Sequence, residues 1–541
     1  MQLSPSAHSD TFCRDRLPPA GEWPDLRFTL TELRYPQRLN CAQTLLDATV
    51  ARYGPDRPCL HTADGTWTYK DLLRRANQAA EVFTSDFGLV PGNRVLLRGP
   101  NNPWLVAAWF GVLKAGGVVV TTMPLLRAVE VSALAELTQP ALAVCDHRFT
   151  ADLAAGAPGL PTVCYGGDGE LADRCAGKSG SFAAVATAAD DVALLATTSG
   201  TTGKPKATMH FHRDVLAIND TFGRHVLAAR PDDVFTGTPP LGFTFGLGGL
   251  VVFPFGIGAS TLLLERASPA DLAGAIAEHG VTALFTAPTM YRALLTAGKT
   301  EALRGLRRCV SAGEHLPAAV WHDFRAATGV KIIDGIGSTE LLHIFISAAD
   351  DAIRPGATGV VVPGYEAAVL GDDGKPVPDG TLGRLAVKGP TGCRYLADER
   401  QRNYVVDGWN ITGDSYTRDG EGYYWYQART DDMIISAGYN VAGPEVEHAL
   451  LGHPDVMEAG VVGAPDPERG TIIKAYVVLR DGVPATPAQA AAKAAELQAF
   501  AKQVIAPYKY PRAVEFTAAL PKTATGKLQR YRLRQLAATG R

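Results

Sequence analysis

A run of hydroxyl, glycine and lysine residues at 197–206 carries the sharpest chemical signal in the sequence. It reads T-T-S-G-T-T-G-K-P-K and follows a short apolar segment. Glycines let backbone N–H groups approach phosphate oxygens, hydroxyls donate hydrogen bonds and lysines offset negative charge, so the run predicts a polyphosphate-binding loop. Gly200 and Gly203 are separated by two residues where a Walker A loop needs four, which argues against a hydrolytic P-loop NTPase.

Five further polar clusters follow this run in order along the chain. The family resemblance that these clusters carry implies the attack of a carboxylate on the α-phosphate of ATP, a reaction that needs the reactants in line and the charge on the leaving pyrophosphate neutralised. Lysine side chains and Mg²⁺ can supply that neutralisation. The clusters are S-A-G-E at 311–314, D-G-I-G-S-T-E at 334–340, I-T-G-D at 411–414, R-T-D-D-M-I at 429–434 and P-K-T-A-T-G-K at 521–527.

Together these segments resemble the adenylate-forming superfamily, which contains acyl- and aryl-CoA ligases, luciferases and stand-alone adenylation domains. The resemblance covers nearly the whole chain. It implies that residues of the phosphate loop, the adenine-binding segments and a ribose-binding pair hold ATP and AMP. These residues are Thr198, Ser199, Gly200, Thr201, Thr202, Gly203, Lys204, Lys206, Gly313, Glu314, Asp334, Gly335, Ile336, Gly337, Asp414 and Arg429.

The resemblance also implies the composition of the reacting centre. Thr339 would contact the α-phosphate, Glu340 would hold Mg²⁺, and Asp414 and Arg429 would bind the ribose hydroxyls. Lys527 would reach from a C-terminal domain to the carboxylate and α-phosphate oxygens during adenylation. The alternative for Lys527 is a solvated basic tail, because other lysines and arginines surround it. Its place in the Gly-Lys pair of the family segment favours the catalytic role.

A hinge and a thiol tunnel are implied near the start of the C-terminal part. Asp431 lies where the superfamily has its hinge, and a few backbone torsions there can absorb a domain rotation between the two half-reactions. That rotation would present Ser436, Ala437 and Gly438 to the site as part of the CoA tunnel, where glycine leaves room for the pantetheine arm. The alternative for Asp431 is an ordinary turn between domains.

One departure from the common family pattern concerns the adenine site. Many members have an aromatic residue immediately before the second glycine of the 334–340 segment, whereas this chain has Ile336, so stacking on adenine is lost or replaced by aliphatic contact. The variant D-G-I-G-S-T-E followed by L-L-H-I-F resembles the benzoate-CoA ligase branch of the superfamily.

The branch resemblance implies a small, flat acyl pocket. Phenylalanine rings and glycine backbone suit an aromatic ring better than a long fatty chain. His343 could donate a hydrogen bond to the aryl carboxylate, or it could only brace the pocket wall. The expected aryl-acid pocket consists of Phe243, Thr244, Phe245, Gly246, Gly337 and His343.

The first forty residues resemble 2-aminobenzoate-CoA ligases in particular. They include S-A-H-S-D-T-F at 6–12 and L-R-Y-P-Q-R-L-N-C at 33–41. The resemblance makes 2-aminobenzoate the preferred substrate, followed by benzoate or hydroxybenzoate. Thr244 is the polar side chain among the aromatic residues that we nominate to contact a ring substituent.

The predicted activity is that of an ATP-dependent aryl-CoA ligase. It forms an aryl-adenylate and pyrophosphate from ATP with Mg²⁺, and the thiol of CoA then displaces AMP. One alternative is a stand-alone adenylation enzyme that loads the same acid onto carrier-protein phosphopantetheine. Another is a non-catalytic module that senses nucleotide or aryl acid, but the intact Glu340, Asp414, Arg429 and Lys527 argue against it.

The elements that must position these residues can be predicted from apolar periodicity and capping signals. Between 190 and 340, strands at 192–196, 281–286, 306–311 and 331–333 alternate with helices, as in an α/β sheet. Thr68 and Ser268 are expected helix N-caps, and a helix over 316–328 should stop at Gly329. In the C-terminal part we expect helices at 446–451 and 487–504 and strands at 459–462 and 475–479.

The expected fold class is α/β within a multi-domain α+β chain. A large N-terminal domain of α/β sheets, with a β-rich subdomain beyond residue 355, would span 1–430. Residue 431 would be the hinge, and a small mobile α+β domain would span 432–541. At roughly 150 residues per domain, 541 residues allow three or four domains or subdomains.

Composition excludes several classes of protein. The chain has 46% hydrophobic and 20% charged residues and a formal charge of −3, which is typical of a globular enzyme and gives no reason to expect nucleic acid as a partner. Residues 234–264 carry no charge, but their prolines and glycines predict buried pocket wall and strand, not a membrane span. Scattered cysteines and the lack of a signal-like start favour the cytoplasm. Neither monomer nor homodimer is favoured.

Overall fold

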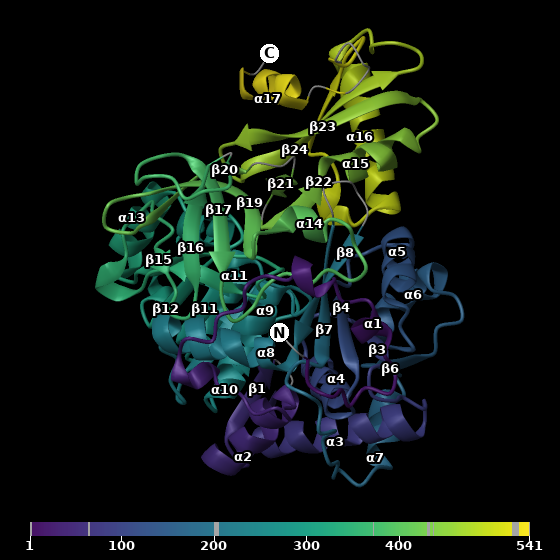
Figure 1. The fold of residues 1–541 in the computed structure, drawn as a ribbon. Coiled ribbons are helices and arrows are strands. Elements are labelled where there is room, and N and C mark those ends of the chain that lie inside the picture. Colours follow the sequence, from purple (N-terminus) through teal and green to yellow (C-terminus); the bar gives the residue numbers. More distant parts are fainter. Residues whose placement is uncertain are drawn as a thin grey trace.

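The computed structural model describes residues 3–62, 65–199, 205–371, 373–429, 433–436, 438–521, 528 and 530–539. Its strands form a nine-stranded, a six-stranded, a five-stranded, a three-stranded and a two-stranded sheet. Figure 1 draws the six-stranded sheet on the right, the nine-stranded sheet on the left and the C-terminal three-stranded sheet above both. The predicted α/β class with a large N-terminal part and a small C-terminal part is confirmed.

The six-stranded sheet is built around fully buried strands. Both β3 and β5 are buried at every position, as expected for parallel strands that are covered on both faces. All neighbouring pairs are parallel except β7 with β8, which form an antiparallel pair. The strands in spatial order are β6 (Thr162–Tyr165), β5 (Leu142–Asp146), β3 (Arg94–Arg98), β4 (Val118–Thr122), β7 (Val192–Ser199) and β8 (Pro205–Phe211).

The nine-stranded sheet contains three of the four strands predicted between 190 and 340. Those three, β11, β12 and β13, are parallel neighbours, but the strand predicted at 192–196 is β7 of the other sheet, so the prediction of one sheet is wrong. The order is β15 (Val360–Val361), β14 (Ile344–Ser347), β13 (Ile332–Gly337), β12 (Arg308–Ser311), β11 (Ala283–Thr286), β9 (Val234–Gly237), β10 (Ser260–Leu262), β1 (Pro58–Thr62) and β2 (Gly65–Thr68).

The predicted helix boundaries are confirmed where capping signals were present. Thr68 and Ser268 each form a capping box with an aspartate three residues later. Gly329 adopts a left-handed conformation with φ of 78° and ends its helix. Outside the stretch 234–264, the α-helices described in the N-terminal part are α1 (Phe12–Asp15), α2 (Ala48–Tyr53), α3 (Tyr69–Ser85), α4 (Pro103–Lys114), α5 (Ala128–Thr138), α6 (Thr150–Gly156), α7 (Leu171–Ala176), α8 (His212–Ile218), α11 (Pro269–Glu278), α12 (Pro288–Thr296), α13 (Ala318–Thr328) and α14 (Gln401–Tyr404).

The uncharged stretch 234–264 is buried but only partly extended. Strands β9 and β10 lie at its ends, as predicted, whereas its middle is helical, with α9 (Thr244–Leu247), the π-helical η6 (Gly248–Val252) and α10 (Phe253–Gly256). A glycine is required at 249, because a Cβ there would lie 2.6 Å from the Phe285 ring. Among the described residues, no helix is both long and apolar enough to cross a membrane.

The β-rich unit predicted beyond residue 355 is an antiparallel sheet. Its strands are β16 (Glu366–Leu370), β17 (Gly383–Lys388), β18 (Val405–Val406), β19 (Trp409–Arg418) and β20 (Tyr424–Arg429). Strands β19 and β20 pair directly, with Asp414 opposite Arg429.

The C-terminal part has its own apolar core around Val446, Val461 and Val477. All four elements predicted there are confirmed. The predicted hinge at Asp431 lies outside the described residues, so the domain limits remain predictions. The elements are β21 (Met433–Ser436), β22 (Tyr439–Ala442), α15 (Gly443–Leu451), β23 (Val456–Asp466), β24 (Gly470–Leu479), α16 (Pro487–Val504), the 3-10 turn η9 (Pro507–Lys509), β25 (Ala513–Phe516) and α17 (Arg530–Thr539).

Candidate active site

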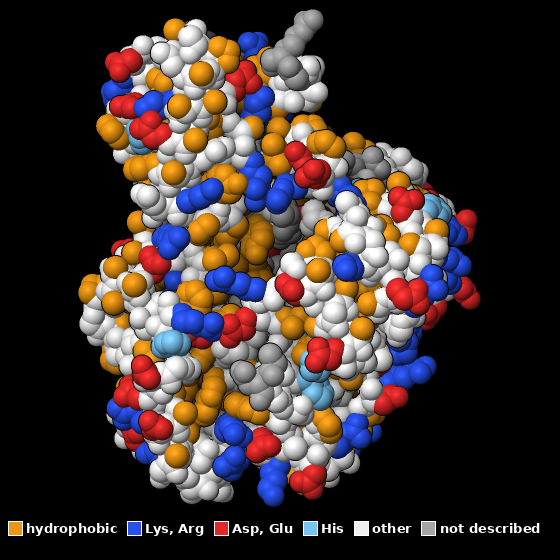
Figure 2. Space-filling view, turned by 180° about the vertical axis from the view of Figure 1, so that it is seen from behind, with side chains coloured by type: hydrophobic (Ala, Val, Ile, Leu, Met, Phe, Trp, Pro, Cys, Tyr) orange, Lys and Arg blue, Asp and Glu red, His pale blue; other side chains and the backbone are white. Residues whose placement is uncertain are grey.

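A cavity of about 1710 Å³ lies between the N-terminal sheets and the C-terminal part. Figure 2 shows hydrophobic side chains inside a hollow below the C-terminal part, with lysine and arginine side chains around it. The structure brings many of the residues predicted from the sequence together on its wall. They are Thr198, Phe243, Thr244, Phe245, Gly313, Gly337, Thr339, His343 and Gly438.

The predicted phosphate loop connects two paired strands at one edge of this cavity. In the antiparallel ladder Thr198 is opposite Lys206, and Ser199 is opposite Pro205. The ladder therefore presents Thr198 and Lys206 at the base of the loop. Gly200, Thr201, Thr202, Gly203 and Lys204 lie outside the described residues, as does the side chain of Ser199.

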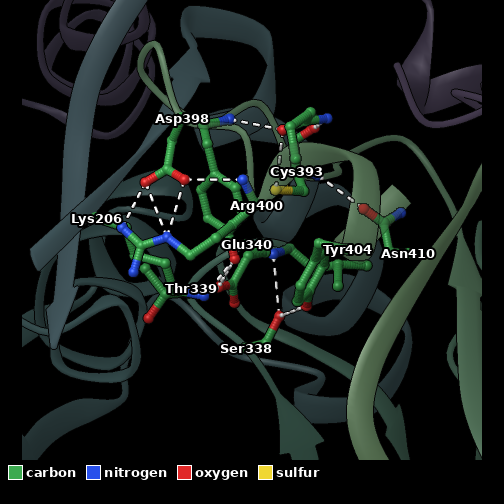
Figure 3. A network of polar contacts seen from close by, with 12 residues as sticks. Lys206, Ser338, Thr339, Glu340, Cys393, Asp398, Arg400, Tyr404 and Asn410 are labelled. Atoms are coloured by element: carbon green, nitrogen blue, oxygen red, sulfur yellow. Dashed lines mark hydrogen bonds and ion pairs between the residues drawn. The ribbon is translucent and has the colours of Figure 1, made fainter. Parts of the chain in front are cut away.

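Lys206, Glu340 and Tyr395 form a buried polar cluster beside the loop. The Lys206 Nζ lies 2.8 Å from Glu340 Oε1, and the Tyr395 hydroxyl donates to the same oxygen at 2.6 Å. Lys206 also donates to the Tyr395 hydroxyl. Figure 3 shows Lys206 and Glu340 meeting in this network. Sequence reasoning missed Tyr395, which is far along the chain from both partners.

The charge of Glu340 is fixed by this cluster. Burial alone would raise its pKa, but the charge of Lys206 and hydrogen bonds from Lys206 and Tyr395 lower the pKa to about 2. Glu340 is therefore an ionised carboxylate at neutral pH. One ionised carboxylate beside the predicted phosphate loop fits Mg²⁺, which proteins usually bind through one or two carboxylates together with substrate phosphates and water.

The turn that carries Thr339 is held from two sides. A ring nitrogen of the buried His210 lies 2.8 Å from the Thr339 carbonyl oxygen. The Ser338 hydroxyl accepts the Leu341 amide at 3.2 Å and lies 3.3 Å from the Tyr404 hydroxyl. These bonds place Thr339 on the cavity wall next to Glu340 (Figure 3).

Of the residues predicted for adenine, Gly313 and Glu314 follow the end of β12, and Asp334 to Gly337 lie within β13. Burial raises the pKa of Asp334 to about 8, although the Ser311 hydroxyl and the Gly335 amide oppose the shift. Burial also raises the pKa of Glu314 to about 6, against backbone hydrogen bonds from Gly438 and Thr289.

Other predicted nucleotide-binding residues are less fully described. Ile336 on β13 is half-buried and pairs with Ile346 of β14. Asp414 is 7% exposed and lies opposite Arg429, whose side chain is not described. The two residues predicted to bind the ribose are thus paired in the ladder of β19 and β20. Lys527 and Ala437 lie outside the described residues.

The far end of the cavity is aromatic. Phe243, Thr244 and Phe245 reach it from the start of α9, and His343 reaches it from the segment before β14. Gly246 does not line it: a Cβ there would lie 2.2 Å from the Pro240 carbonyl oxygen, so this glycine allows close backbone packing instead.

The hairpin of β21 and β22 closes the cavity from the C-terminal side. Gly438 has a φ of +80°, and a Cβ there would lie 3.4 Å from Ala287 Cβ. Tyr439 stacks on Tyr508 with 4.2 Å between ring centroids and meets Phe243 at 5.9 Å. Ser436 does not line the cavity, because its hydroxyl donates to the Thr471 carbonyl at 3.0 Å.

A buried ion cluster joins the two parts of the chain beside this hairpin. Lys509 Nζ lies 2.7 Å from Glu130 of α5 and 2.6 Å from Glu445 of α15. Glu130 also accepts the Ala506 amide at 3.1 Å. All three charged side chains are at least 86% buried, since their exposed fractions are 4%, 8% and 14%. No local sequence signal could have revealed this cluster.

Comparison with known proteins identifies the class to which this site belongs. Residues 46–395 match the model of the AMP-binding enzyme family, and residues 445–527 match the model of the AMP-binding enzyme C-terminal domain. The chain is 35% identical over 515 residues to a benzoate–CoA ligase of Thauera aromatica, covering 93% of this chain and 97% of that protein.

Two further relatives agree with this match. The chain is 36% identical to a 4-hydroxybenzoate–CoA/benzoate–CoA ligase of Rhodopseudomonas palustris, covering 93% of this chain and 95% of that protein. The solved structure of the anthranilate CoA ligase AuaEII in complex with anthranoyl-AMP has a TM-score of 0.73 and 33% identity, covering 94% and 99% of the two chains. The chain belongs to the AMP-binding, adenylate-forming enzyme family and, within it, to the benzoate-CoA ligase branch.

Proposed function

We propose that the protein is an AMP-forming aryl-CoA ligase that activates 2-aminobenzoate. The observation that carries this is one cavity with two ends of different chemistry. Thr198 and Thr339 line one end, beside the ion pair of Lys206 and the ionised Glu340, and Phe243, Phe245 and His343 line the aromatic end. An aromatic acid in this cavity can place its carboxylate toward the α-phosphate of ATP.

In the first half-reaction the protein holds the reactants in line and offsets charge. Lys206 and the phosphate loop at 200–204 bind the polyphosphate, Thr339 contacts the α-phosphate, and Asp414 with Arg429 holds the ribose. Lys527 neutralises charge on the attacking carboxylate and the α-phosphate. Glu340 would hold Mg²⁺, which would supply positive charge against the leaving pyrophosphate. Positioning and charge stabilisation of this kind supply most of the catalysis in phosphoryl and nucleotidyl transfer.

In the second half-reaction the CoA thiol displaces AMP from the aryl-adenylate. The described arrangement suits this step, because Gly438 lines the cavity beside Ala287 and leaves space for a narrow thiol arm. A rotation about Asp431 would move the β21–β22 hairpin away from the cavity and bring Lys527 to it. We therefore propose that residues 1–430 and 432–541 are the two moving domains.

The choice of acid rests on likeness to known proteins. AuaEII, whose structure holds anthranoyl-AMP, is 33% identical to this chain, and anthranilate is 2-aminobenzoate. The relatives that act on benzoate and hydroxybenzoate are equally similar, so these acids are the next candidates.

Product analysis by mass spectrometry tests the proposed function. The protein is incubated with ATP, Mg²⁺, CoA and an equimolar mixture of 2-aminobenzoate, benzoate, hydroxybenzoates and a long-chain fatty acid. We expect 2-aminobenzoyl-CoA and AMP as the main products. Aryl-AMP and pyrophosphate without any CoA thioester would point instead to the loading of a carrier protein. A fatty acyl-CoA as the main product would overturn the proposal.

A further inference from the structure

His210 is a fully buried polar side chain that faces the turn carrying Thr339 and Glu340. It lies on strand β8, four residues after Lys206, and side chains at even spacing point to the same face of a strand. Lys206 contacts the Glu340 carboxylate, and His210 contacts the carbonyl of Thr339. One face of β8 therefore meets two consecutive residues to which the proposed function assigns the α-phosphate and Mg²⁺.

The hydrogen bond between His210 and this turn has a defined direction. His210 Nε2 lies 2.8 Å from the Thr339 carbonyl oxygen. A carbonyl oxygen can only accept, so Nε2 carries the hydrogen and donates it. The same oxygen accepts the Leu342 amide at 3.3 Å. The Thr339 carbonyl is thus held both from within its own turn and from β8.

This carbonyl belongs to the peptide group that joins Thr339 to Glu340. Because a peptide group is planar, fixing its C=O also fixes the direction of its N–H. Against the effect of burial, Lys206, Tyr395 and this N–H lower the pKa of the Glu340 carboxyl group to about 2. His210 therefore fixes the peptide plane between the residue proposed to contact the α-phosphate and the residue proposed to hold Mg²⁺.

The turn contains a strained residue and needs external support. Leu342 has a φ of 71°, in the left-handed region that residues other than glycine rarely adopt, and its side chain is fully buried. Such a conformation persists only where the surrounding structure over-determines it. The bond from His210 ends on the same carbonyl that accepts the Leu342 amide, so it is one of the contacts that hold this conformation.

The other side of the imidazole ring faces a buried ion pair. His210 Nδ1 lies 3.9 Å from Asp214 Oδ2. Asp214 pairs with Arg394, and both side chains are fully buried. Asp214 also accepts the Phe211 amide at 3.0 Å. The ring is thus enclosed between a carboxylate that is fixed by its own partners and the turn that carries Thr339.

We propose that His210 is a positioning residue, whose Nε2–H holds the Thr339–Glu340 peptide in the orientation in which Thr339 meets the α-phosphate. The inference rests on the proposed function, which assigns the α-phosphate to Thr339. His210 does not line the cavity, so it acts through the turn and does not touch the nucleotide. Loss of the bond should weaken the binding of the phosphate and leave the binding of the nucleoside unchanged.

The test separates the contribution of the phosphate from that of the nucleoside. Dissociation constants for AMP and for adenosine are measured by isothermal titration calorimetry with the full chain in buffer without Mg²⁺. The adenosine constant divided by the AMP constant gives the phosphate ratio, which reports how much the phosphate adds to binding. A general disturbance of the pocket weakens both ligands alike and leaves the phosphate ratio unchanged.

Two substitutions distinguish the two nitrogens of the ring. A glutamine amide can donate from about the position of Nε2, whereas an asparagine amide lies near the position of Nδ1 and falls short of the Thr339 carbonyl. The variants are therefore His210→Gln and His210→Asn. His212→Asn is the matched control, because His212 is equally buried two residues away, but its Nδ1 accepts the Cys41 amide at 3.1 Å.

We expect His210→Asn to lower the phosphate ratio by about tenfold, as for loss of a hydrogen bond to a charged group. His210→Gln should keep most of the wild-type ratio, and His212→Asn should leave it unchanged. The adenosine constant should be the same in every variant. His210→Leu removes both nitrogens without adding a buried polar group, is expected to match His210→Asn, and carries the test if His210→Asn does not fold.

Three results would overturn the inference. Equal weakening of AMP and adenosine in His210→Asn would show that His210 only supports the fold. An unchanged phosphate ratio in His210→Asn and His210→Leu, or an equal loss in His212→Asn, would exclude a specific effect on the turn. The proposed function fails separately, if the wild type binds AMP but forms no adenylate with any aromatic acid.

Discussion

Beside the predicted phosphate loop, one hydroxyl connects Lys206 and Glu340, the charged residues that we propose bind the polyphosphate and Mg²⁺. The Tyr395 hydroxyl donates to Glu340 and accepts from Lys206. It therefore helps to keep the Glu340 carboxylate ionised and turned toward the lysine. Hydrogen bonds to charged groups are stronger than those between neutral groups, so this hydroxyl is a sensitive point of the site.

We expect Tyr395→Phe to lower kcat/KM for ATP in pyrophosphate exchange by about 10- to 100-fold, because a hydrogen bond to a charged group contributes about 1.5–3 kcal/mol. Thioester formation from supplied aryl-AMP should change much less. Tyr404→Phe is the matched control, since the Tyr404 hydroxyl lies near the neutral Ser338 hydroxyl. Equal losses in the two variants would contradict this role of Tyr395.

A second prediction at the residue scale concerns the stability contributed by His343. Burial lowers the pKa of the folded-state imidazole to about 3, whereas an exposed histidine titrates near 6.5. Between these values the unfolded chain binds more protons, so stability rises with pH and is lost as the pH falls below about 6.5. Relative to wild type, His343→Leu should gain about 2 kcal/mol of unfolding free energy between pH 7 and pH 5.

Thermal unfolding of both proteins at the two pH values measures this gain. Other buried histidines, such as His212, are present in both proteins and cancel in the difference. The melting temperature of the variant minus that of wild type should increase from pH 7 to pH 5. A gap independent of pH would show that His343 is not held neutral in the folded protein.

At the scale of elements, the hairpin of β21 and β22 is the feature that couples the C-terminal part to the cavity. Its turn needs the left-handed conformation at Gly438, and that residue faces Ala287 at the end of β11. A methyl group at this position would therefore have two effects, backbone strain and less space on the cavity wall where we propose that the thiol arm passes.

We expect Gly438→Ala to slow thioester formation from supplied aryl-AMP by about tenfold or more and to raise KM for CoA, because the strain alone costs about 1–2 kcal/mol. Pyrophosphate exchange should be nearly unchanged. Gly482→Ala is the matched control, since Gly482 has a φ of +84° with nothing within 4 Å of the added carbon. Similar losses in both variants would attribute the effect to general strain and not to the tunnel.

The elements that could be predicted from sequence are those specified by neighbouring residues. Thr68 and Ser268 bond to aspartates three residues away, and Gly329 ends its helix through its own backbone. The order of the segments proposed to bind phosphate, adenine and ribose could likewise be predicted, because each is a short contiguous motif. In the backbone Asp414 and Arg429 do lie opposite each other.

The features that could not be predicted depend on contacts between distant residues. Tyr395 and Glu340 are 55 residues apart, and Lys509 and Glu130 are 379 residues apart. The division of the strands at 190–340 between two sheets also depends on contacts between distant segments. Strand β7 pairs with β4 and β8, and β11 pairs with β9 and β12. The helical middle of 234–264 was missed because a short apolar run does not distinguish a buried strand from a buried helix.

At the scale of the whole molecule, the Glu130–Lys509–Glu445 cluster stabilises the described orientation of the two parts. Two carboxylates share one lysine in a buried position, and only Glu130 belongs to the N-terminal part. Removal of its charge weakens the attachment between the parts while leaving the Lys509–Glu445 pair inside the C-terminal part. A rotation of the C-terminal part must break the same contact.

We expect Glu130→Gln to slow thioester formation from supplied aryl-AMP by about tenfold, or about 1.4 kcal/mol, without slowing pyrophosphate exchange. Glu515→Gln is the matched control, because Glu515 pairs with Lys474 within the C-terminal part at 2.7 Å. Stopped-flow measurement of the two half-reactions separates the effects. Slower pyrophosphate exchange in Glu130→Gln would show that the described orientation serves adenylation instead.

In the proposed mechanism, one cavity forms a non-covalently bound aryl-adenylate before the thiol acts. The most direct test is a rapid-quench experiment with stoichiometric enzyme, ATP, Mg²⁺ and 2-aminobenzoate in the absence of CoA, followed by addition of CoA. We predict about one equivalent of pyrophosphate and of bound aryl-AMP per enzyme before the addition, and conversion to AMP and aryl-CoA after it. Formation of ADP and phosphate, or no cleavage of ATP until CoA is present, would contradict the account.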